Sequence, residues 1–164
     1  MKNHILLLLM VSLIFSCKKT EKQLELEEVP NPEIEKSISE IKAGLNEKGF
    51  QTFDYFDEKS QDTILMQQYF IAFLKRGPNR SQTKEEADSL QTLHLAHLGK
   101  MYDLGYADIS GPFGDDGDIR GITIYNVPTL KMADSLANSD PMVKAGRLII
   151  EVHPWWAAKG FPLR

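Results

Sequence analysis

The chain has 164 residues, of which 42% are hydrophobic and 26% are charged, as is typical of a globular protein. Its net charge of -4 provides no basic field for nucleic acid, so we expect no nucleic-acid partner. The single cysteine, Cys17, excludes an intrachain disulfide and a zinc site built from several cysteines.

Residues 1–16 have the pattern of an export signal. Lys2 precedes an almost wholly apolar run over residues 5–15, which has the length of a signal-peptide core rather than of a membrane span. The run ends at Ile14-Phe15-Ser16-Cys17, which resembles the bacterial lipobox, whose cysteine receives the lipid and becomes the mature N-terminus. A signal anchor, or a conventionally cleaved peptide with a chance cysteine, is the alternative. We expect a protein of the cell envelope that faces the periplasm and is lipid-anchored to a membrane through Cys17.

The segment after the signal is expected to contain a tether and a small N-terminal extension. Residues 17–32 are rich in lysine and glutamate and bury little apolar surface, which predicts a flexible tether. Over residues 33–48, isoleucine and leucine recur at helical spacing, which predicts an amphipathic helix that ends near Gly49. This helix either packs on the main domain, which we favour, or binds a partner. With a strand over residues 50–56, it forms an extension over residues 33–66.

Residues 67–160 form the predicted main domain. Four segments have the β-branched and aromatic residues of strands, over residues 63–75, 106–110, 121–127 and 147–153. Two helices lie between them, over residues 83–104 and 128–137, and Pro154 is expected to end the last strand. This order predicts a ferredoxin-like βαββαβ fold of the α+β class, with an antiparallel sheet and both helices on one face. The other face is partly apolar, so we expect a homodimer that buries it.

The helix over residues 83–104 is expected to turn both of its histidines, His94 and His97, toward the protein. Thr83 and Glu86 have the spacing of a capping box at its start. At 100° per residue, one stripe of the helix collects the apolar residues and the histidines. That stripe consists of Leu90, Leu93, His94, His97, Met101 and Leu104.

Several short motifs occur along the main domain in a characteristic order. They are His94-Leu95, Gly105, Gly111-Pro112, Asp140-Pro141, Gly146 and Val152-His153-Pro154-Trp155. In their order and spacing the chain resembles the YciI-like (YCII-related) family of dimeric α+β barrel proteins. The resemblance implies a ferredoxin-like dimer with an active pair formed by His94 and Asp140. Some members look like lyases or dehalogenating enzymes that act on hydroxylated aromatics.

His94 and Asp140 are therefore the candidate catalytic residues. The usual pKa of histidine, about 6.5, suits a general acid or base near neutral pH, although a histidine at this position can also fill a gap between helix and sheet. Asp140 can orient and charge-balance His94, as a carboxylate does for an imidazole in acid–base sites. Alternatively, it caps the turn that starts at Pro141, and the two roles are compatible.

The candidate substrate-binding residues lie beside the loop over residues 111–118. Ser110, Gly111 and Pro112 are expected to form the rim of a small-molecule site. His153 is a further candidate at a different place, because it shares a strand face with Glu151 and could line a cavity between the two subunits of the dimer. The favoured interpretation is that it covers the edge of the domain together with the tryptophans that follow.

We expect no metal and no cofactor. His94 and His97 have no third ligand at a recognisable spacing. Asp116 and Asp118 begin a calcium-loop pattern, but Arg120 occupies a later ligand position, so a solvated Asp-rich turn is favoured.

Three basic residues, Lys75, Arg76 and Arg80, cluster after the first strand of the main domain. They could receive an anionic substrate group, but surface charge at a strand exit is the favoured interpretation.

Two functions remain open on the sequence. The first is a small lyase or isomerase that uses His94 and Asp140 for proton transfer on a small organic substrate. The alternative is a non-enzymatic dimeric module of the cell envelope that binds a ligand or a protein.

Overall fold

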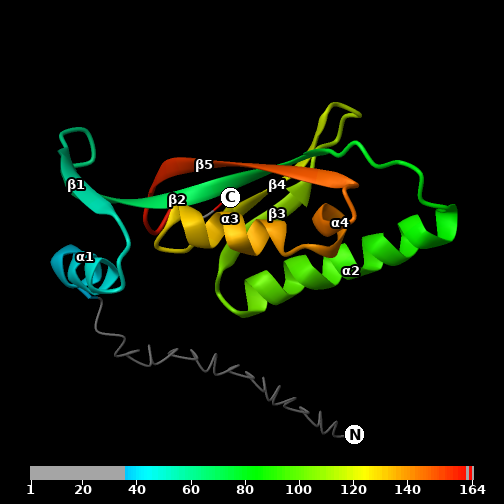
Figure 1. The fold of residues 1–164 in the computed structure, drawn as a ribbon. Helices are drawn as coiled ribbons and strands as arrows, with labels where there is room; N and C mark the ends of the chain where they lie inside the picture. Colours follow the sequence, from blue (N-terminus) through cyan, green and yellow to red (C-terminus); the bar gives the residue numbers. More distant parts are fainter. Residues whose placement is uncertain (1–35, 162, 164) are drawn as a thin grey trace, which may run out of the picture. The chain divides into compact units, whose positions relative to one another are not determined.

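The computed structural model describes residues 36–161 and 163 (Figure 1). The expected signal peptide, the tether and Cys17 lie outside these residues. Within the described part of the chain, no helix is long and apolar enough to cross a membrane.

The fold is α+β with an antiparallel sheet of five strands, as the sequence predicts. Its elements in chain order are α1 (Ile38–Glu47), β1 (Thr52–Asp57), β2 (Asp62–Arg76), α2 (Lys84–Asp103), β3 (Ala107–Pro112), β4 (Ile119–Tyr125), α3 (Leu130–Asn138), α4 (Pro141–Lys144) and β5 (Leu148–Ala158). From β2 to β5 this is the expected βαββαβ order. Figure 1 shows α2, α3 and α4 on the same face of the sheet.

The central strand of the sheet is β2, which gives the spatial order β5–β2–β4–β3. Ile71 of β2 lies opposite Ile124 of β4 on one edge and opposite His153 of β5 on the other. The hairpin strand β1 pairs with the first residues of β2. It lies along the same edge of β2 as β4, because β5 occupies the opposite edge where the two pairings overlap. The strand β2 is continuous from Asp62 to Arg76, so it runs through the expected boundary between residues 66 and 67.

The long helix α2 begins as its sequence predicts. The backbone N–H of Glu86 donates to Oγ1 of Thr83 at 3.2 Å, and the backbone N–H of Thr83 donates to the carboxylate of Glu86 at 2.8 Å. Such an N-cap stabilises a helix by about 1 kcal/mol. The helix is followed by Gly105, whose φ of 70° lies in the left-handed region that favours glycine. These two signals fix the length of α2 and therefore the height of His94 along it.

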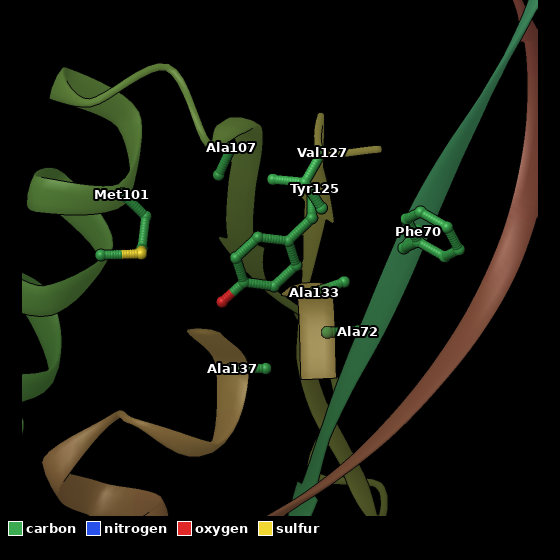
Figure 2. Packing of buried hydrophobic residues seen from close by; sticks show 8 residues of the cluster. All are labelled: Phe70, Ala72, Met101, Ala107, Tyr125, Val127, Ala133 and Ala137. Atoms are coloured by element: carbon green, nitrogen blue, oxygen red, sulfur yellow. The ribbon is translucent and has the colours of Figure 1, made fainter. Parts of the chain in front are cut away.

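The main core lies between the sheet and its helices, and small residues let α3 approach the strands closely. Figure 2 shows Tyr125 in the middle of this cluster, with its hydroxyl directed to the side of Met101 and Ala137. The buried members are Phe70, Ala72, Met101, Ala107, Tyr125, Val127, Ala133 and Ala137.

The predicted inward stripe of α2 is correct for its centre and wrong for two leucines. His94 and Met101 are buried, but Leu93 is 49% exposed and Leu104 is 52% exposed. The reason is the position of the helix: α2 contacts β3 and α4 at the margin of the sheet, whereas α3 covers β2 and β5. A helix at the margin of a sheet buries fewer of its apolar residues than a helix that lies over the centre of the sheet.

The expectation that Pro154 ends the last strand is wrong, because β5 continues to Ala158. The backbone N–H of Lys159 donates to Leu65 at 2.8 Å, and that of Gly77 donates to Arg147 at 3.0 Å. In this register, hydrogen bonds between β2 and β5 involve the odd-numbered residues of both strands. Pro154 is at an even position, where its missing N–H points away from β2, so the strand tolerates it.

Candidate functional site

The structure places His94 and Asp140 in direct contact. Nδ1 of His94 lies 2.6 Å from Oδ2 of Asp140, although the two residues are 46 positions apart in the chain. His94 comes from the middle of α2 and Asp140 from the N-cap of α4, and they are 8% and 2% exposed. A hydrogen bond of this length that involves a buried carboxylate is of the strong, charge-assisted kind.

Asp140 makes a cap contact and a contact with His94 at the same time. Its Oδ1 accepts the backbone N–H of Met142 at 2.7 Å, while its Oδ2 faces His94. The cap therefore fixes the plane of the carboxylate before the imidazole meets it. Because an ionised carboxylate only accepts hydrogen bonds, we infer that Nδ1 of neutral His94 carries the proton and Nε2 holds the lone pair.

Among the described residues, His94 is the one basic side chain that pairs with Asp140. Burial lowers the pKa of His97, which keeps that imidazole neutral near pH 7. Burial and the negative charge of Asp140 both raise the pKa of Tyr125, which keeps its phenol protonated. A proton that arrives on His94 would therefore be stabilised by an adjacent carboxylate that forms no other ion pair among the described residues.

His94 lines a cavity of about 400 Å³ on the helix-covered side of the sheet. This volume lies in the range of small-molecule sites, about 300–1,000 Å³. The walls come from α2, α4, the strands β2, β3, β4 and β5, and the connections before α2 and β5. Ser110, Gly111 and Pro112 of β3 are all part of the lining, so the structure brings these three candidates together with His94.

His153, the fourth substrate-binding candidate, does not reach this cavity. Along β5, Ile150 and Val152 face the core, so His153 points to the helix-free face. There its Nε2 lies 2.7 Å from Oε1 of Glu151, and its ring meets the edge of Phe73. The alternation of the strand therefore separates His153 from His94.

Three arginines also line the cavity: Arg80, Arg120 and Arg147. Among the described residues that form the lining, none is acidic. The sequence indicated Arg80 as a candidate for an anion, but it gave no reason to group Arg80 with the other two. Arg120 is on β4 and Arg147 directly precedes β5, and only the strand pairing brings them to the same end of the sheet.

The other two basic candidates, Lys75 and Arg76, lie outside the cavity lining and have acidic partners. Nζ of Lys75 is 3.2 Å from the carboxylate of Glu151, and Nη2 of Arg76 is 3.1 Å from Oδ1 of Asp116. For these two residues, the interpretation as paired surface charge agrees with the structure.

No metal centre can be assembled from the part of the chain that the structure describes. It contains no group of three or more His, Cys, Asp and Glu side chains that could hold an ion. In the Asp-rich turn, Asp116 is bound by Arg76 and by Arg120, whose Nη1 lies 2.7 Å away. These guanidinium contacts lower the pKa of Asp116. The turn is therefore organised by arginine.

Comparisons with known proteins leave the family open. No family model matches the chain, and no curated protein matches its sequence. Among solved structures, 5-chloro-2-hydroxyhydroquinone dehydrochlorinase from Burkholderia phenoliruptrix AC1100, in complex with 2,5-dihydroxybenzoquinone, aligns with a TM-score of 0.40 and 23% sequence identity. The alignment covers 53% of this chain and 92% of that chain. A likeness at this level carries no argument, so the function must be argued from the site itself.

Proposed function

We propose that this chain is a YciI-like lyase or isomerase in which His94 transfers a proton on a small organic substrate. The observation that carries the proposal is the 2.6 Å contact between His94 and Asp140 at the wall of the 400 Å³ cavity. A buried imidazole with a fixed carboxylate behind it and a cavity in front of it is the arrangement that general acid–base chemistry requires.

The proposed proton transfer begins at Nε2 of His94. This nitrogen takes a proton from a C–H or O–H group of the substrate, and the electron pair of the broken bond stays on the substrate. The imidazolium that forms keeps its Nδ1–H bond to Asp140, whose negative charge stabilises it. Return of the proton to another atom of the substrate completes an isomerisation, and its delivery to a leaving group completes an elimination.

The test uses exchange of substrate protons with deuterium, because it detects proton transfer before the product is known. A panel of small organic acids and hydroxylated aromatics is incubated with the protein in D₂O and followed by proton NMR. We expect exchange in at least one compound, and we expect His94→Ala to slow it by about 10²–10⁴-fold, the usual contribution of a general base. His153→Ala is the matched control, because it removes a histidine outside the cavity. Equal exchange rates for His94→Ala and the wild type would refute the proposal.

The alternative is a non-enzymatic module of the envelope. The exposed aromatics Phe53, Tyr55 and Phe56 of β1 favour it, since such residues are frequent in contacts between proteins. Under this alternative, deuterium exchange in the compounds of the panel is the same for the wild type and for His94→Ala. Replacement of Tyr55 and Phe56 by serine would instead abolish capture of the partner.

We also propose that the chain forms a homodimer through the helix-free face of its sheet. This face carries Ile149 and Trp155, which are 44% and 41% exposed in the single chain. Light scattering on the full chain tests the proposal, with Ile149→Glu expected to shift the mass from dimer to monomer. An unchanged mass for this variant, or a monomeric wild type, would contradict it.

The proposed lipid anchor rests on Cys17 and the lipobox-like residues before it. Cell fractionation tests this anchor: the wild type should sediment with membranes, and Cys17→Ala should move to the soluble fraction or keep an uncleaved signal. Metabolic labelling with a fatty acid should mark the wild type alone.

A further inference from the structure

The distribution of charge around the cavity is unlike that of the rest of the chain. The whole sequence carries a net charge of -4, yet the cavity lining contains three arginines and, among the described residues, no acidic one. The three guanidinium groups reach the same end of the sheet from three separate segments. Since like charges repel, such a convergence is unfavourable in an empty cavity unless an anion balances it.

The arginines of the cavity have few partners of opposite charge. Nη1 of Arg147 donates to the neutral Oε1 of Gln82 at 3.2 Å, and Arg80 makes no side-chain hydrogen bond or ion pair among the described residues. Arg120 does contact the carboxylate of Asp116. The side chain of Asp116 is 88% exposed, however, and it also binds Arg76. The positive charge that faces the cavity is therefore only partly neutralised.

The closeness of these groups also affects Arg80. Partial loss of hydration lowers the pKa of its guanidinium, although the residue is exposed overall, and repulsion from Arg147, Arg76 and Arg120 lowers it further. By contrast, the basic residues just outside the lining, Lys75 and Arg76, each have an acidic partner. The two described arginines without an acidic partner, Arg80 and Arg147, are thus both in the cavity lining.

We propose that this cavity binds a small organic anion through a carboxylate or phosphate group held by Arg80, Arg120 and Arg147, which places the rest of the molecule beside His94. This inference rests on the proposed function and deepens it by naming the substrate class. Guanidinium groups suit this task because their fixed donors bind two oxygens of a carboxylate or phosphate at once. A cavity of about 400 Å³ accommodates a molecule with one ring or a short chain in addition to the anionic group.

The binding test uses three probes of similar shape on the full chain, measured by calorimetry: benzoate, phenyl phosphate and neutral benzamide. We expect at least one of the two anions to bind about tenfold or more tightly than benzamide, as the loss of a charge-assisted hydrogen bond implies. The comparison of benzoate with phenyl phosphate decides between carboxylate and phosphate. Failure of both anions to bind, or equal binding of benzamide, would overturn the inference.

Two variants that each remove one positive charge sharpen the test. Arg80→Gln removes a cavity arginine that is exposed and forms no side-chain hydrogen bond or ion pair among the described residues. The variant should therefore fold, which a melting curve checks. We expect this variant to weaken anion binding by about tenfold. Lys84→Gln is the matched control and should change the affinity by less than about twofold, because its ammonium group is exposed, pairs with Asp88 and is not part of the cavity lining. Equal losses in both variants would show that the anion binds elsewhere.

The binding and exchange assays together separate this inference from the proposed function. His94→Ala should retain anion binding while it loses deuterium exchange. Exchange that depends on His94 but binding that ignores Arg80 would overturn the inference and leave the proposed function standing. Binding that depends on Arg80, in the absence of exchange that depends on His94, would overturn the proposed function and leave anion binding standing.

Discussion

Gly77 and Gly146 lie so close that a Cβ on Gly77 would be 2.3 Å from the carbonyl oxygen of Gly146. The approach is held by backbone hydrogen bonds from Gly77 to Arg147 and from Asn79 to Gly146, both of 3.0 Å. These contacts join the end of β2 to the start of β5. They thereby set the positions of Arg80 and Arg147, the two cavity arginines that follow these turns.

Gly77→Ala should destabilise the protein, because the added methyl group forces two backbone segments apart. We expect the free energy of unfolding to fall by about 1–3 kcal/mol, the usual cost of overpacking, measured by urea denaturation. Gly99→Ala is the control: it lies within α2, nothing comes within 4 Å of the added Cβ, and alanine should stabilise the helix by up to about 1 kcal/mol. A Gly77→Ala variant as stable as the wild type would mean that β5 can shift without cost.

Asp140→Ala should be considerably more destabilising than Asp140→Asn. Alanine leaves both the backbone N–H of Met142 and the imidazole of His94 without their buried acceptor, at a cost of about 2–5 kcal/mol. Asparagine still caps α4, so most of the stability should remain while the charge behind His94 is lost. Denaturation curves measure the first difference, and deuterium exchange measures the second. Equal stability of the two variants would contradict the double role of this residue.

His97 should make the protein less stable at acidic pH. Burial lowers its pKa from the usual value of 6.5, so below that pH the unfolded chain binds a proton that the folded chain does not. The stability linked to His97 is therefore present above pH 6.5 and is lost as the pH falls below it. His97→Leu should reduce this loss, as measured by melting temperatures between about pH 5 and pH 8. It should also fold well, because among the described residues Nε2 of His97 is buried without a hydrogen-bond partner.

Asp116→Asn should increase the affinity of the cavity for anions. The carboxylate of Asp116 binds Arg120 and thus competes with a ligand for one of the three guanidinium groups. Because this ion pair is exposed, its removal should change stability by less than about 1 kcal/mol. Calorimetry with benzoate or phenyl phosphate measures the affinity, and Asp88→Asn, which removes an exposed ion pair on α2, is the control. A loss of affinity in Asp116→Asn would indicate that Asp116 positions Arg120 instead.

Local signals predicted much of the framework and half of the site. The capping box at Thr83 and the glycine at position 105 give the limits of α2, and the helical period turns His94 inward. The place of Asp140 beside His94 was implied by the family resemblance, whereas its role as a helix cap was detectable because a capping residue before a proline is a local pattern. These features depend only on residues within a few positions of each other.

The remaining features depend on pairing between distant segments. Arg120 and Arg147 reach the cavity through the register of β4 and β5 on β2, which no local pattern reveals. His153 points to the helix-free face, as the alternation of β5 predicts, and therefore lies away from the cavity beside His94. The exposure of Leu93 and Leu104 likewise follows from the place of α2 at the margin of the sheet.

The proline within β5 has a consequence for the behaviour of the protein in concentrated solution. Among the described residues, β5 pairs with β2 alone, so its outer edge offers free backbone groups to another chain. Pro154 lies near the middle of this edge, and it removes one donor from the ladder that an added strand would need. Growth of the sheet by addition of a strand at this edge is thereby disfavoured.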